Sequence, residues 1–95
     1  MICNEIKTLL ANKAINRNRL QLLRYNDALE MIKICEKNHI EVLGIDAFVL
    51  LEGGFIRPCM ENSVDFSSPF HPSKMSAHDF MISHKNDDMV FEIVI

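Results

Sequence analysis

The 95-residue sequence has little of the residues that mark several protein classes. It contains only three glycines and three prolines, which argues against collagen and low-complexity linkers. Hydrophobic residues make up 48% of the chain and charged residues 24%, so the chain carries enough apolar surface to fold. At this length we expect a single domain spanning residues 1–95, because two cores would not fit.

Long apolar runs are also missing. The longest uninterrupted run, Ala47 to Leu51, is far shorter than the roughly 18 residues that a membrane helix needs. Asn4 and Glu5 stand where a signal peptide would carry basic and then apolar residues. The sequence therefore predicts a soluble protein that stays in the cytoplasm.

The few cysteines form no recognisable motif. Cys3, Cys35 and Cys59 are widely spaced and include no CxxC pair, and an odd number argues against a disulfide framework. We expect reduced thiols that are mostly buried.

Catalytic motifs are absent as well. The sequence has no GxSxG, HExxH, P-loop or GxGxxG pattern, and no nucleophile is paired with a base in a recognisable frame. His71, His78 and His84 could supply metal ligands, but their spacing does not place two of them on one helical face. We therefore expect a protein that is not an enzyme and needs no metal or other cofactor.

What the sequence does contain is an uneven distribution of charge. Residues 1–38 hold seven basic and four acidic side chains, a net of +3, whereas residues 39–95 hold three basic and nine acidic ones, a net of −6. Solvated helix faces and turn aspartates would explain this pattern without a partner. The functional interpretation is an acidic surface that binds a basic partner.

The first forty residues have apolar side chains at helical spacing. A helix is predicted over Glu5–Lys13, and a short helix over Ile15–Tyr25, where only the first residue is β-branched. A further helix, Ala28–Lys37, follows a capping box headed by Asp27, and we expect it to end at Asn38 in a left-handed conformation.

From residue 40 onward, short runs of Val, Ile, Leu and Phe predict strands. The glycine pair at 53 and 54 marks a hairpin between strands Val42–Leu51 and Phe55–Pro58. Gly44 inside the first strand indicates a bulge or a close backbone approach.

The remaining residues predict a loop, a helix and a last strand. Residues 59–74 are expected to form an irregular surface loop, and Ser76 is expected to cap a helix over Ala77–His84 with Phe80 and Met81 on its apolar face. The apolar run Met89–Ile95 predicts a central strand with both faces covered. The predicted fold class is α/β, of the α+β type, with a small, mostly antiparallel sheet of about three strands and two to four helices packed on it.

Two stretches are similar to a known family. The string YNDALEMIKICEKNHIEVLGIDAF (Tyr25–Phe48) and the closing VFEIVI (Val90–Ile95) resemble the aromatic-x-D-A-L helix, the VLGxDxF strand and the terminal strand of small bacterial immunity proteins. These proteins belong to contact-dependent growth inhibition and polymorphic toxin systems, and the likeness is greatest to the family catalogued as immunity protein forty. Many members carry Trp where this chain has Tyr25. The resemblance implies a non-enzymatic inhibitor that binds the toxic C-terminal domain of a large secreted effector.

The resemblance also gives the acidic half of the chain a role. Many such toxins are nucleases with a positive substrate cleft, which carboxylates would complement while speeding the encounter. Helix capping would equally explain Asp79, and turn formation would equally explain Asp87 and Asp88. The candidate toxin-binding residues are the carboxylates expected outside the core: Glu52, Glu61, Asp65, Asp79, Asp87 and Asp88.

An alternative function uses the basic half instead. Arg17, Arg19 and Arg24 lie near Tyr25 and could form a patch for nucleic acid. A pI of 5.7 and an aromatic content of 7% count against it. A small cytosolic nucleic-acid-binding regulator therefore stays the second hypothesis, and no membrane partner is expected.

Overall fold

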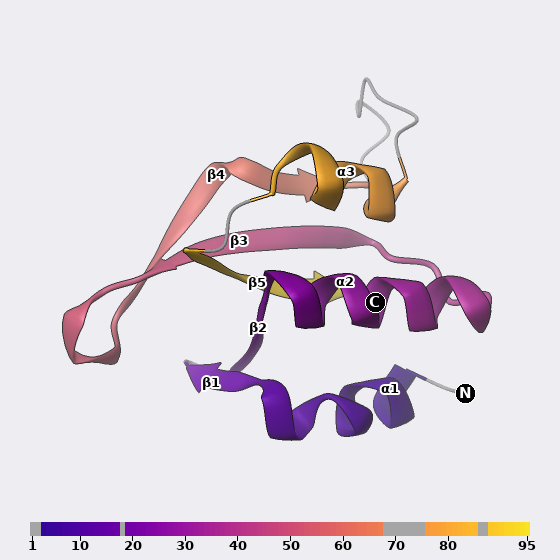
Figure 1. The fold of residues 1–95 in the computed structure, drawn as a ribbon, viewed down its shortest axis with the longest axis horizontal. Helices are drawn as coiled ribbons and strands as arrows, with labels where there is room; N and C mark the ends of the chain where they lie inside the picture. The colour runs from indigo at the N-terminus through magenta and orange to yellow at the C-terminus, as the bar shows by residue number, and fades with distance from the viewer. Residues whose placement is uncertain (1–2, 18, 68–75, 86–87) are drawn as a thin grey trace.

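The computed structural model describes residues 3–17, 19–67, 76–85 and 88–95. Within these residues the chain has an α+β fold, with three α-helices and one antiparallel sheet of five strands (Figure 1). No helix among them is both long enough and apolar enough to cross a bilayer. The elements in chain order are α1 (Cys3–Leu9), η1 (Ala11–Lys13), β1 (Ile15–Arg17), β2 (Leu20–Arg24), α2 (Tyr25–Lys37), β3 (Gly44–Leu50), η2 (Glu52–Gly54), β4 (Ile56–Asp65), α3 (Ala77–Ser83) and β5 (Met89–Val94).

The strands follow the order β1-β2-β5-β3-β4 across the sheet. The C-terminal strand β5 lies in the middle, paired with β2 on one side and β3 on the other, which confirms the central position predicted from its apolar run. The prediction of about three strands was too low. The two additional strands are β1 and β2.

A hairpin replaces the short helix that we predicted over Ile15–Tyr25. Ile15 pairs with Leu22 across the hairpin, and Arg19 takes a left-handed φ of 65° in the turn. Leu22 and Leu23 point to opposite faces of the sheet, yet both are fully buried. Burial on two faces outweighs the weak β-propensity of these leucines, because strand preference depends mainly on packing.

The core lies between the sheet and the helices. Helix α2 contacts β5 and β2 and lies between α1 and α3 (Figure 1). The Tyr25 ring meets the Phe91 ring edge to face at 6.4 Å, which joins the start of α2 to the central strand. The fully buried residues of this cluster include Ile6, Leu23, Ala28, Ile32, Cys35, Ile45, Ala47, Met81 and Phe91.

The buried residues of the helices all pack on one face of the sheet. The opposite face, here called the second face, carries no helix among the described residues, contrary to the expectation that helices cover β5 on both faces. Val90 on this face is nevertheless fully buried, together with Leu22. The tip of the β3–β4 hairpin approaches β1, because a Cβ built on Gly54 would lie 3.2 Å from the Nε of Arg17. The two outer edges of the sheet therefore curl toward each other over this face.

Helix α2 differs from its prediction at both ends. It begins at Tyr25, three residues before the predicted Ala28. Its N-cap residue is Arg24, which makes no side-chain capping bond, so the prediction of a capping box headed by Asp27 was wrong. Because β2 leads directly into α2, burial of Tyr25 fixes the start. At the other end Asn38 has a φ of −100°, and the left-handed residue is His39, with a φ of 57°.

The predicted helix after Ser76 is confirmed as α3. The Asp79 N–H donates to Ser76 Oγ at 3.1 Å, and Phe80 and Met81 are both buried. The close approach at Gly44 is confirmed too, since a Cβ there would lie 3.0 Å from the Val64 carbonyl oxygen.

The predicted loop over residues 59–74 was wrong in its first part. Strand β4 continues to Asp65, because Val64 and Phe66 pack against the core; residues 68–74 lie outside the described residues. Cys35 is buried and Cys59 is half-buried, and neither forms a disulfide within the described residues, while the side chain of Cys3 lies outside the description.

Candidate protein-binding surface

Strand β4 forms one outer edge of the sheet, since within the described part of the chain it pairs with β3 alone. Together with the turn that leads into it, β4 exposes several large apolar side chains and carboxylates. We call this set the β3–β4 surface; it has two parts, about 16 Å apart along the strand, which are Leu51, Glu52 and Phe55 at the turn and Met60 and Glu61 in the bulge.

The hairpin turn forms the first part of the β3–β4 surface. The Leu51 N–H donates to the Phe55 carbonyl at 2.8 Å, and Gly53 and Gly54 both take left-handed φ values of 77° and 81°, which favour glycine. This turn projects beyond the helices (Figure 1) and leaves Phe55 71% exposed and Leu51 44% exposed. Glu52 is exposed beside them.

A bulge in β4 forms the second part. Ile45 pairs with Val64 and Ala47 with Cys59, so residues 60–63 stand opposite a single residue of β3. Ser63 Oγ accepts from the Ala47 N–H at 2.9 Å and donates to the Cys59 carbonyl at 2.8 Å, which replaces part of the interrupted ladder. The bulge turns Met60 outward, where it is 78% exposed, with Glu61 exposed next to it.

The outer edge of β4 resists addition of another strand. The Leu51 N–H donates to the Phe55 carbonyl, and hydrogen-bonded and non-hydrogen-bonded pairs alternate along an antiparallel ladder. The Phe48–Pro58 pair, three positions along, is therefore non-hydrogen-bonded, and the Pro58 nitrogen, which has no hydrogen, faces outward. Because Pro58 and the bulge interrupt the row of donors, a partner at this edge would bind through side chains.

The predicted carboxylates do not all lie together. Glu52 and Glu61 belong to the β3–β4 surface, but Glu61 lies in the bulge opposite Asp46 and so is nearer along the hairpin to Asp65 than to Glu52. Asp65 ends β4 opposite Gly44, at the far end of the hairpin from Glu52, and it accepts from the N–H and Oγ of Ser67 at 2.9 and 2.6 Å. The length of β3 separates Asp65 from Glu52 by about 20 Å.

The other predicted carboxylates lie away from this hairpin. Asp79 is exposed in the first turn of α3, 3.8 Å from His78 Nδ1. Asp88 is exposed directly before β5, and Asp87 lies outside the described residues.

A further pair of carboxylates lies on the second face of the sheet. Asp46 and Glu92 stand directly opposite each other on β3 and β5. Burial raises the pKa of Glu92, the charge of Asp46 raises that pKa further, and Lys7 opposes both effects. Like charges at directly opposed positions destabilise a sheet, so this pair is a cost to folding.

The histidines form no metal site among the residues that the structure describes. The His84 ring stacks on Phe80 with centroids 4.1 Å apart, and its Nδ1 lies 2.9 Å from the Phe80 carbonyl oxygen. His71 lies outside the described residues. In the described part of the chain, no group of three or more His, Cys, Asp or Glu side chains could hold a metal ion.

Comparison with known proteins places the chain in no family. No family model, no curated protein and no solved structure matches it. The likeness to immunity proteins therefore stays a prediction from the sequence.

The apolar part of the β3–β4 surface was missed by reasoning from the sequence. Met60 falls in the segment predicted as a loop, and its exposure depends on a bulge that only strand pairing reveals. Phe55 carried a signal, because a large apolar residue directly after a glycine pair stands at a hairpin turn, where burial is poor.

Proposed function

We propose that this chain is a cytoplasmic immunity protein that binds and neutralises the toxic domain of a contact-dependent inhibition or polymorphic toxin effector. We expect that toxin to be a nuclease. The protein acts by binding alone, without catalysis or a cofactor. The proposal is supported by the sequence resemblance and by one structural observation, the exposure of Phe55 and Met60 beside carboxylates on the β3–β4 surface.

The chemistry of this surface suits a protein partner. Aromatic residues and Met are enriched at the centres of protein interfaces, where burial supplies most of the affinity. Two exposed apolar side chains such as Phe55 and Met60 gain that energy only when a partner covers them. Glu52 and Glu61 flank them and would speed association with a positive cleft.

The first test uses the apolar side chains. The variant Phe55→Ser with Met60→Ser should bind the toxin domain encoded by the neighbouring reading frame at least tenfold more weakly, mainly through faster dissociation. The matched control is Leu9→Ser with Ile82→Ser, because these residues are also large, apolar and exposed, at 53% and 52%, but lie on α1 and α3. Surface plasmon resonance measures both rates.

The same measurement tests the charges. Glu52→Lys with Glu61→Lys should slow association and reverse its dependence on salt, whereas Glu5→Lys with Glu36→Lys changes the net charge equally on α1 and α2 and should have a much smaller effect. If the apolar and the charge variants both bind as tightly as the wild-type protein, the interface lies on another surface of the molecule. Failure of the native protein to bind the neighbouring gene product, combined with salt-dependent binding to RNA or DNA, would favour the nucleic-acid alternative.

A further inference from the structure

Strands β2 and β5 separate after a short ladder. Leu23 pairs with Phe91 and Arg24 with Val90, but β2 extends back to Leu20 and β5 runs on to Val94 without further pairing between the two strands. Among the described residues, the edge of β5 that faces β2 therefore has no strand beside it from Glu92 onward. An unpaired edge presents N–H and C=O groups that another extended chain can bind.

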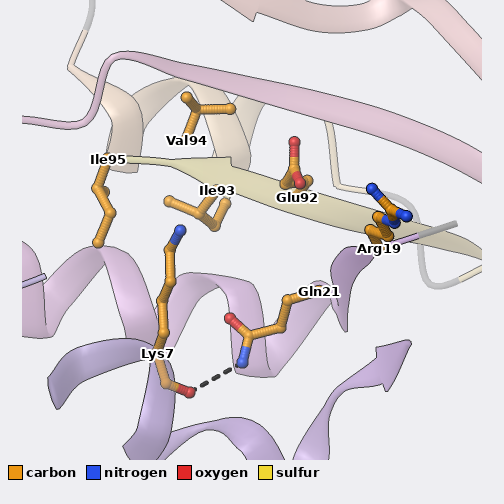
Figure 2. A pocket seen from close by; sticks show the side chains of 7 residues that line it. All are labelled: Lys7, Arg19, Gln21, Glu92, Ile93, Val94 and Ile95. Carbon is orange, nitrogen blue, oxygen red and sulfur yellow. Dashed lines mark hydrogen bonds between the residues drawn. The ribbon is translucent and has the colours of Figure 1, made fainter. Parts of the chain in front are cut away.

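We call the space between the separating strands the fork. It contains a cavity of about 300 Å³. Helix α1 borders it, because Gln21 Nε2 donates to the Lys7 carbonyl at 2.8 Å and so holds α1 beside β2 (Figure 2). This volume is at the lower end of the range for ligand pockets, so it suits a short piece of chain better than a large cofactor. The lining residues are Lys7, Arg19, Gln21, Glu92, Ile93, Val94 and Ile95.

The side chains that line the cavity include two cations and one acidic group. The Lys7 side chain extends toward β5 (Figure 2), and the left-handed turn at Arg19 places a second cation at the other end. Within the described residues neither cation forms an ion pair. Glu92 is the single acidic side chain in the lining, so the side chains of the lining leave one cation more than they have acidic groups.

We propose that this fork binds an extended acidic segment of a partner protein, which adds as a strand to the free edge of β5 and pairs its carboxylates with Lys7 and Arg19. In this mode backbone hydrogen bonds supply affinity and alternate side chains supply specificity. The edge of β5 differs from that of β4, because it carries neither a proline nor a bulge among its described residues. The site is separate from the β3–β4 surface, since β3 lies between β5 and β4.

The experiment titrates the ¹⁵N-labelled protein with a capped peptide of seven residues that alternates valine and aspartate. Amide shifts should concentrate at Gln21 and at residues 92–95, and amide exchange along that edge should slow. A peptide with asparagine in place of aspartate should bind at least tenfold more weakly. A peptide N-methylated at alternate amides should not bind, because it cannot form the ladder; this control leaves the protein unchanged.

Protein variants test the two cations. Lys7→Gln with Arg19→Asn should weaken binding of the acidic peptide at least tenfold. Asparagine is chosen at position 19 because it tolerates the left-handed conformation there. Lys33→Gln with Lys37→Gln removes the same charge from exposed positions on α2 and should have little effect. Equal binding of the aspartate and asparagine peptides, shifts centred on β4, or the same shifts with inorganic phosphate alone would each overturn the proposal.

Discussion

Two isoleucines in α2 allow the contribution of core packing to be measured with helix propensity cancelled. Ile32 is fully buried and Ile34 is half-buried in the same helix. Replacement by alanine removes three carbon atoms in each case and gains the same few tenths of a kcal/mol in propensity. At about 0.8 kcal/mol per buried methylene, Ile32→Ala loses about 2.4 kcal/mol of transfer energy. The cavity left behind raises the total to about 3–4 kcal/mol.

For Ile34→Ala the partial burial reduces the expected loss to about 1 kcal/mol. Urea unfolding followed by circular dichroism measures both values, and an unchanged slope with denaturant would show that the same surface is exposed in each variant. The Ile32 variant should also melt roughly 12–32 °C lower than the native protein, because each kcal/mol shifts the midpoint by roughly 4–8 °C at this size. Equal losses in the two variants would refute the placement of Ile32 in the core and of Ile34 at its border.

Two further predictions concern a cap and a carboxylate. Ser76→Ala should lower the free energy of unfolding by about 1 kcal/mol, because the Asp79 N–H loses its acceptor; an equal loss in Ser83→Ala, at the end of the same helix, would contradict the capping role. Because the pKa of Glu92 is raised above its ordinary 4.5, the folded protein holds a proton that the unfolded chain releases, so this group lowers stability as the pH rises from 4.5 through the raised pKa. Glu92→Gln should therefore be more stable than the native protein at neutral pH and lose less stability over that range in urea titrations, and an unchanged pH dependence would contradict this.

The elements that could be predicted from the sequence are those with local signals. Helix α3 has a capping serine and an apolar stripe that its neighbours in sequence already define. The run Met89–Ile95 is apolar at nearly every position, which only a strand in the middle of a sheet accommodates. In both cases a short segment contains the reason for its own conformation.

The elements that could not be predicted depend on contacts made far along the chain. Leu22 and Leu23 fit a helix as well as a strand until β5 is placed beside them. Strand β4 continues past Pro58 because Ser63 bridges Ala47 and Cys59 across the bulge. For the same reason the exposure of Met60 could not be read from its neighbours in sequence.

The uneven charge along the chain becomes an uneven charge across the sheet. β1 and β2 come from the basic half, whereas β5, β3 and β4 come from the acidic half. The strand order keeps the two halves side by side, with their border between β2 and β5, where the fork lies.

This arrangement separates the two proposed binding surfaces. Strands lie about 4.8 Å apart, so the outer edge of β4 is about 10 Å from β5, which is about one Debye length at 0.1 M salt. Salt attenuates the interaction of exposed charges at that separation. Glu52 stands at the hairpin tip, which approaches Arg17, whereas Glu61 lies in the bulge of β4. Reversing the charge of Glu61 alone therefore tests the β3–β4 surface with the least effect on Lys7 and Arg19 in the fork.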